Sequence, residues 1–177
     1  MPNPEGPGGS HEGAEPRTVE VALRPVETAH LPVLFEHQSD PEACRMAAFP
    51  ARGREAFDAH WVKILSDPMV RARTILADGR VAGDILSWTQ DGEREVGYWL
   101  GRQFWGRGIA TRALRAFLAD EGDGPVFGHV AKHNPASRRV LEKCRFVLCG
   151  EMRRACGEPP VEAEEFVLKW ERARVKP

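Results

Sequence analysis

Residues 96–118 read VGYWLGRQFWGRGIATRALRAFL, and this stretch is the most informative part of the chain. It begins as the end of a predicted strand, continues into a loop that contains Gly106 and Gly108, and closes with apolar residues at helical spacing from Ile109 to Leu118. A loop that opens onto a helix exposes backbone N–H groups at the positive end of the helix dipole, and glycine lets an anion approach them closely. The stretch therefore predicts a strand, an anion-binding loop and a helix.

Upstream of the loop, three antiparallel strands joined by tight turns are expected over residues 70–77, 81–89 and 94–100. Asp-Gly pairs at 78–79 and 91–92 separate them, because a hairpin turn needs residues that accept a positive φ. The remaining upstream elements are a strand over 19–23, helices over 28–35 and 54–65, and irregular chain over 38–52, which contains two prolines.

Downstream of the loop helix, a strand is expected over 126–131, a helix over 136–144, and strands over 146–151 and 164–170. An antiparallel meander thus gives way to a β-α-β crossover. This order predicts an α+β domain with a mixed central β-sheet flanked by helices.

The bulk properties are those of one globular domain. With 177 residues the chain is long enough to bury a core, and we expect residues 18–177 to form it. Residues 1–17 are rich in proline, glycine and glutamate, and we expect a disordered tail there.

Several function classes are disfavoured by composition. The formal net charge of -1 gives no general basis for nucleic-acid binding. No run of about 18 apolar residues and no apolar signal segment occur, so no membrane contact and a cytoplasmic location are expected. The 4 cysteines lack CxxC spacing, and no other metal motif is present, so no metal is expected.

Three phosphate-binding patterns compete for the loop. Gly101 and Gly106 have the spacing of a nucleotide-hydrolysing P-loop, but Arg107 and Gly108 follow in place of lysine and a hydroxyl residue. A dinucleotide-binding GxGxxG pattern would need glycine or alanine where Thr111 stands. The third pattern, Q/R-x-x-G-x-G/A, is matched by QFWGRG at residues 103–108.

This third pattern resembles the pyrophosphate loop of the GNAT acetyltransferase superfamily. A second segment, HNPASRRVLEKCRF at residues 133–146, resembles the N-x-x-S-x-x-V-L-E-K-x-G-F segment of the same superfamily. The overall look is closest to the branch of ribosomal-protein N-terminal (serine/alanine) acetyltransferases. The resemblance implies a GNAT-like fold.

The resemblance also implies an enzyme, an acyl-CoA-dependent N-acetyltransferase. Acetyl-CoA or another short acyl-CoA would donate its acyl group directly to a primary amine of a protein N-terminus or small molecule. A non-catalytic acyl-CoA-binding regulatory protein is the alternative. A homodimer is compatible with the sequence. The residues expected to bind the acyl-CoA are Trp99, Leu100, Gln103, Gly106, Arg107, Gly108, Ile109, Ala110, Asn134 and Ser137.

Two residues are the candidates for catalysis. Glu95, on the strand that enters the loop, is the expected base for the amine, acting through a water; the alternative is a solvated carboxylate. Ser137 is the expected donor to the leaving thiolate, and its alternative role is to satisfy backbone N–H groups at the helix start. His129, on a predicted strand, is interpreted as structural.

The chain departs from the superfamily pattern at two positions. Leu141 stands where many members carry a tyrosine that serves as general acid, so the thiolate must be protonated in another way. Arg145 stands where the pattern has glycine, so it must adopt a left-handed conformation at a cost, or the helix must end differently.

Overall fold

The computed structural model describes residues 18–122, 124–157 and 160–172, and the expected tail over 1–17 lies outside these ranges. The helices and strands follow the chain in this order: β1 (Val21–Arg24), the 3-10 turn η1 (Thr28–His30), α1 (Leu31–Gln38), α2 (Pro41–Ala47), α3 (Arg54–Ser66), β2 (Arg71–Ala77), β3 (Arg80–Gln90), β4 (Glu93–Leu100), the 3-10 turn η2 (Arg102–Phe104), α4 (Ile109–Ala119), β5 (Val126–Ala131), α5 (Pro135–Lys143), β6 (Val147–Cys156) and β7 (Val161–Trp170).

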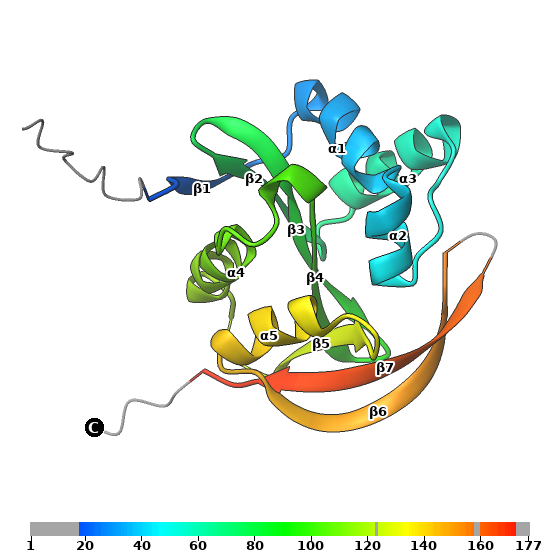
Figure 1. Cartoon of the computed structure of the whole chain (residues 1–177), viewed down its shortest axis with the longest axis vertical. Coiled ribbons are helices and arrows are strands. Elements are labelled where there is room, and N and C mark those ends of the chain that lie inside the picture. The colour runs from blue at the N-terminus through cyan, green and yellow to red at the C-terminus, as the bar shows by residue number, and fades with distance from the viewer. Residues whose placement is uncertain (1–17, 123, 158–159, 173–177) are drawn as a thin grey trace, which may run out of the picture.

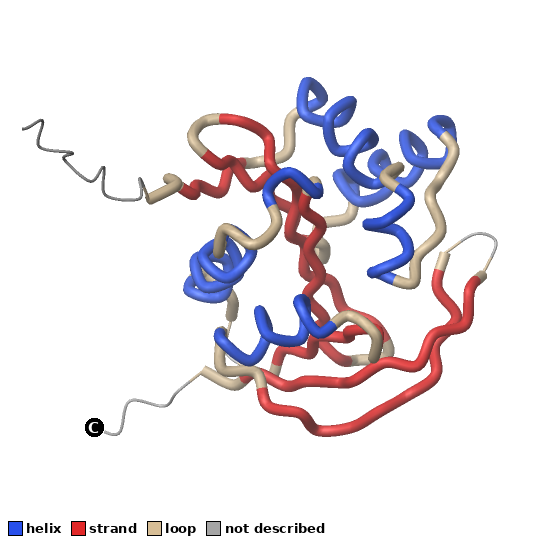
Figure 2. Tube along the Cα trace, in the orientation of Figure 1, coloured by secondary structure: helices blue, strands red, loops and turns tan. Residues whose placement is uncertain are grey.

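Within the described residues, seven strands form one sheet in the order β1-β2-β3-β4-β5-β7-β6. β4 and β5 run parallel, and the other neighbours in this sheet are antiparallel. Figure 1 shows α4 and α5 on one side of the sheet and α1, α2 and α3 on the other, and Figure 2 shows the strands passing between these two groups of helices. The predicted meander, the crossover through α4 and the mixed α+β sheet are confirmed.

The two tight turns of the meander have the backbone that their residues predict. Asp78 and Gly79 have φ values of 49° and 75°, and Asp91 and Gly92 have values of 52° and 83°. Positive φ at both central residues gives the turn a twist that matches its flanking strands. These turns keep β2, β3 and β4 adjacent and bring β4 to the centre of the sheet.

The expectation of irregular chain over residues 38–52 is wrong where α2 forms. Asp40 caps this helix by accepting a hydrogen bond from the backbone N of Ala43 at 3.0 Å. Pro41 occupies the first helical position, where its fixed φ is favourable and its missing N–H costs nothing. The proline therefore begins a helix instead of interrupting one.

The last hairpin is longer than expected, because β6 and β7 stay paired from Val147 and Lys169 to Cys156 and Val161. Figure 1 shows this hairpin curving past β5 toward α2. Its far end therefore lies beside the first helices.

Apolar side chains cover both faces of the sheet. On one face, α4 contributes the fully buried side chains of Ile109, Ala113, Leu114 and Phe117 to the larger core. On the other face, the smaller core consists of Leu34 from α1 and of Phe57 and Trp61 from α3. The helical face predicted for α4 is thus the face that it buries. No helix in the described ranges is long and apolar enough to cross a bilayer.

β4 and β5 are paired over a short distance. Arg94 pairs with Val126 and Glu95 with Phe127, and the register ends there. β5 instead continues along β7, from Val126 to Ala131. The sheet therefore opens between β4 and β5, just before the chain enters the glycine loop.

Candidate active site

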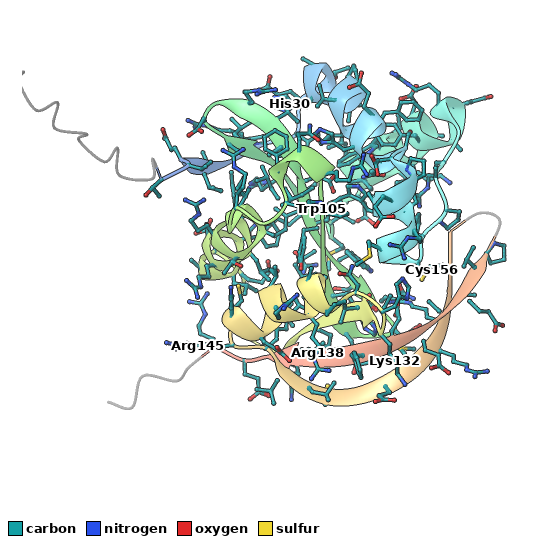
Figure 3. All side chains as sticks on the ribbon, in the orientation of Figure 1. His30, Trp105, Lys132, Arg138, Arg145 and Cys156 are labelled. Atoms are coloured by element: carbon teal, nitrogen blue, oxygen red, sulfur yellow. The ribbon has the colours of Figure 1, made fainter. Side chains whose placement is uncertain are left out.

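A cavity of about 430 Å³ occupies the opening between β4 and β5. Its walls are the end of β4, the glycine loop, the first turn of α4, β5, the first turns of α5, and α2. Trp105, labelled in Figure 3, lies on the loop at its rim. The cavity therefore brings together the two sequence segments that carry the predicted site.

Most of the residues predicted to bind the cofactor line this cavity, namely Trp99, Leu100, Gly106, Gly108, Ile109, Ala110, Asn134 and Ser137. Gln103 and Arg107 are not among the lining residues. Nε2 of Gln103 lies 3.1 Å from Nε2 of His37, and Arg107 is exposed. The loop thus faces the cavity mainly with its glycines and with the start of α4.

The loop has the backbone that an anion site needs. Gly106 and Gly108 have φ values of 72° and 70°, and a Cβ added at either would meet no atom within 4 Å. Gly108 is the N-cap residue of α4, and no side chain caps this helix. The first turn of α4 therefore presents uncapped N–H groups beside open space.

Two side chains fix the loop from behind. The indole Nε1 of Trp105 donates to the carbonyl oxygen of Leu100 at 3.0 Å. The guanidinium of Arg112 donates to the carbonyl oxygens of Arg107, at 3.2 Å, and Gly108, at 3.4 Å. The loop is thus held in shape without a ligand.

The start of α5 forms the opposite wall. Oδ1 of Asn134 accepts from the backbone N of Ser137 at 3.0 Å, and its Nδ2 donates to the carbonyl oxygen of Met46 at 3.0 Å. Asn134 therefore caps α5 and ties it to α2. Because this cap satisfies the Ser137 N–H, the Ser137 side chain is left for other contacts.

The Ser137 hydroxyl contacts Tyr98, a residue that the sequence reasoning missed. Oη of Tyr98 lies 2.8 Å from Oγ of Ser137 and 3.3 Å from its carbonyl oxygen. Burial raises the pKa of the Tyr98 phenol, and the hydrogen bond with Ser137 opposes this rise only in part. The phenol stays protonated at neutral pH, so it can donate.

Alternation along β4 could have revealed Tyr98. Trp99 lies on the face of α1, since its Nε1 donates to the carbonyl oxygen of His37 at 2.9 Å. Its neighbour Tyr98 must then point to the face of α5. Tyr98 is also the one tyrosine of the sequence.

Glu95 is buried and held by a charged partner. Its two carboxylate oxygens accept from the guanidinium of Arg154 on β6 at 2.9 and 3.0 Å. It is 5% exposed and is not among the residues that line the cavity. A direct contact between Glu95 and an acceptor is therefore blocked in this arrangement.

His129 and Glu165 reach the cavity from the same side as Glu95. Nδ1 of His129 lies 3.5 Å from Oε2 of Glu165, and its Nε2 lies 3.8 Å from Oε1 of Glu95. Both His129 and Glu165 line the cavity. Sequence reasoning missed Glu165 and Arg154, because nothing local shows that β7 pairs with β5 and that β6 follows on the other side of β7.

Comparison with known proteins places this geometry in a family. The family model for the acetyltransferase (GNAT) domain matches residues 20–147. The chain belongs to the GNAT acetyltransferase family. No curated protein matches the sequence.

Solved structures share the GNAT fold along nearly the whole chain. A putative acetyltransferase from T. thermophilus is 27% identical with a TM-score of 0.70, and the match covers 90% of this chain and 91% of that one. RimL, a ribosomal alpha-N-protein acetyltransferase in complex with coenzyme A, is 19% identical with a TM-score of 0.72 over 85% and 93% of the two chains. The aminoglycoside acetyltransferase AAC(6')-Ib, also in complex with coenzyme A, is 16% identical with a TM-score of 0.71 over 86% and 95%.

The described residues of this GNAT domain contain no group of three or more His, Cys, Asp or Glu side chains placed to hold a metal ion.

Proposed function

We propose that the chain is an acyl-CoA-dependent N-acetyltransferase, which transfers an acetyl or other short acyl group directly to a primary amine of a protein N-terminus or small molecule. One observation carries the proposal. The cavity between β4 and β5 has an uncapped helix start and glycine loop at one end and side chains able to exchange protons along its walls.

The residues present fit a coenzyme A thioester. Gly106, Gly108, Ile109 and Ala110 would hold its pyrophosphate through backbone N–H groups at the start of α4. The remainder of the cavity extends from this loop past Asn134 and Ser137, where the thioester would lie. Gln103 and Arg107 would contribute at the outer edge of the loop.

The chain then has three tasks. A backbone N–H at Trp99 or Leu100 would stabilise the oxyanion that forms on the thioester carbonyl. Ser137, oriented by Tyr98, would donate a hydrogen bond to the departing sulfur. The negative charge of Glu95 would favour loss of a proton from the amine, acting through an intermediate group because Arg154 occupies its oxygens.

Among the possible acceptors, we favour a protein N-terminus. The overall look of the sequence is closest to the ribosomal-protein branch, and RimL is among the structures with the same fold. An α-amine, with an ordinary pKa near 8, also needs less help to lose its proton than a lysine amine near 10.4.

Thermal unfolding with acetyl-CoA, succinyl-CoA, CoA, ATP and NAD tests the binding step. A ligand at about 100 times its Kd adds about 2.7 kcal/mol of stability, which is several degrees for a domain of this size. The proposal expects the shift for CoA species alone. Equal or larger shifts with ATP or NAD would contradict it.

Thiol release from acetyl-CoA tests the chemical step. Suitable acceptor probes are a peptide that begins with serine or alanine, spermidine, and kanamycin. Acceptor-dependent thiol release supports an enzyme. Tight binding of acetyl-CoA without any thiol release would instead favour the non-catalytic regulatory protein.

A further inference from the structure

Four side chains from four strands meet beside the cavity, and we call them the acceptor-side cluster: Glu95 on β4, His129 on β5, Arg154 on β6 and Glu165 on β7. The cluster lies on the face of the sheet opposite α5. A Cβ on Gly128 would come within 2.9 Å of Leu141 on α5, so the next residue, His129, points to the other face. Tyr98 and Ser137 therefore border the cavity from one face and the cluster from the other.

The charges of the cluster are unbalanced. Glu95 and Arg154 form a bidentate pair, in which each compensates the other. Glu165 is 6% exposed, and its Oε2 has no hydrogen-bond partner among the described residues. When both carboxylates are ionised and the imidazole is neutral, the cluster carries two negative charges and one positive charge. A buried carboxylate without compensation is costly, so one further positive charge would stabilise the cluster.

His129 is placed to carry that charge. Its ring lies between the two carboxylates, 3.5 Å from Oε2 of Glu165 and 3.8 Å from Oε1 of Glu95. Neither ring nitrogen has a hydrogen-bond partner among the described residues, so a lone pair is available. Both nitrogens are buried, but rotation about the Cβ–Cγ bond exchanges the nitrogen and carbon positions of the ring. The residue itself is among those that line the cavity.

We propose that His129 takes the proton from the acceptor amine, with Glu165 and Glu95 stabilising the imidazolium; this rests on the acetyltransferase function proposed above. The amine lone pair forms the new C–N bond to the thioester carbon while one amine proton passes to His129. The C–S bond then breaks, and its electron pair leaves on sulfur under the Ser137 hydrogen bond. His129 releases its proton to solvent, and the thiolate takes one from solvent.

The other groups around the ring are consistent with this role. Arg154 prevents Glu95 from acting directly, because both carboxylate oxygens are engaged. Cys156 on β6 is the further titratable group at the cluster, and burial raises the pKa of its thiol, so it remains neutral. From α2, apolar residues line the cavity, including Ala43 and Met46. Of the cluster, His129 and Glu165 line the cavity, so the proton is left to the imidazole with Glu165 as its carboxylate partner.

The test compares His129→Gln, Glu165→Gln and the control His133→Gln. His133 is exposed, and its Nε2 lies 2.7 Å from the carbonyl oxygen of Arg45, a bond that a glutamine amide can also make. Thiol release is followed from pH 5.5 to 9.5 with the three acceptor probes named above. If none reacts, slow hydrolysis of acetyl-CoA gives the same readout, because water must also lose a proton.

His129→Gln should lower kcat at neutral pH about 100-fold or more, with the KM for acetyl-CoA nearly unchanged, and should remove the acidic limb of the pH–rate profile for acetyl-CoA hydrolysis, in which no acceptor amine titrates. Glu165→Gln should lower kcat while retaining the limb. His133→Gln should match the wild type. Added imidazole should restore part of the rate of His129→Ala, which a purely structural role would not allow.

Two results would overturn the role of His129. One is a His129→Gln rate within about threefold of wild type with the limb intact. The other is loss of stabilisation by acetyl-CoA in this variant, which would place His129 in folding or cofactor binding. Failure of the proposed function is a distinct result: folded wild type that is stabilised by acetyl-CoA but releases no thiol with any probe or with water.

Discussion

The hydroxyl oxygens of Tyr98 and Ser137 lie 2.8 Å apart, although 39 positions separate these residues in the sequence. Tyr98 comes from β4 and Ser137 from the first turn of α5, so the pair joins the two walls of the cavity. When the phenol donates to Oγ, the hydrogen of Ser137 is left for an acceptor in the cavity. In that arrangement the tyrosine sets the direction in which the serine donates.

Tyr98→Phe keeps the ring and removes only this hydroxyl. We expect kcat to fall about tenfold, the equivalent of one hydrogen bond, with little change in the KM for acetyl-CoA. Steady-state kinetics of this variant, of Ser137→Ala and of the double variant provide the measurement. Because the two hydroxyls act as a unit, the double variant should be no slower than Ser137→Ala. Multiplicative losses would show that they act separately.

Gly106→Val should remove the stabilisation by acetyl-CoA. Gly106 has a φ of 72°, and valine is strained there and places a branched side chain where the pyrophosphate would bind. Gly79→Val is the matched control, because Gly79 has a φ of 75° in the distant β2–β3 turn. Both variants should melt at lower temperature than the wild type, and only Gly79→Val should retain the acetyl-CoA shift. If acetyl-CoA raised the melting temperature of Gly106→Val as much as that of the wild type, the loop would not be the cofactor-binding element.

Asp84 makes stability depend on pH. It lies on β3 below α1, is 2% exposed, and accepts a hydrogen bond from Nε2 of Gln38 at 3.2 Å. Burial raises the pKa of its carboxyl from 3.8 to about 7, and the bond from Gln38 opposes this rise. The folded chain thus holds the proton more tightly than the unfolded chain. The resulting stabilisation is complete below about pH 4 and is lost as the pH rises through 7.

Asp84→Asn should remove this dependence, since a neutral amide oxygen can still accept from Gln38. We expect a higher melting temperature than wild type at pH 8 and a smaller difference at pH 5. Asp58→Asn, on the exposed surface of α3, controls for the change in net charge. If the difference in melting temperature between Asp84→Asn and wild type were the same at pH 5 and pH 8, the raised pKa of Asp84 would be contradicted.

Arg145→Gly should stabilise the fold. Of the two alternatives for Arg145, the left-handed conformation is the one observed, with a φ of 69°. The backbone N of Phe146 donates to the carbonyl oxygen of Leu141 at 3.1 Å, and that of Arg145 donates to Glu142 at 3.0 Å. This is a Schellman motif, in which glycine is preferred. We expect a gain of about 1 kcal/mol, or a few degrees in melting temperature, and no such gain for Arg145→Ala.

The part of the site that depends on local backbone could be predicted from the sequence. Gly106, Gly108 and the start of α4 follow one another directly, so their spacing shows how they act together. The meander could also be predicted from the sequence, because its two Asp-Gly turns specify which strands are neighbours. Pro41 shows the limit of such signals, since the same residue type breaks one helix and begins another.

The contacts across the cavity could not be predicted in this way. They depend on which strands lie next to β5, and the observed order inserts β7 between β5 and β6. Alternation along a strand gives the face on which a side chain lies but not its neighbour in the sheet. Glu95 was therefore identified without Arg154, which is 59 residues away, and His129 was interpreted without Glu165.

The placement of β7 also bears on how the domain is made on the ribosome. β5 shares two residue pairs with β4 and six with β7. Until residues 161–170 emerge, β5 has an open edge and the wall that carries His129 lacks its main support. A nascent chain that stalls before this point would present an aggregation-prone strand. The hairpin of β6 and β7 thus both covers the edge of β5 and supplies Arg154 and Glu165 to the acceptor side.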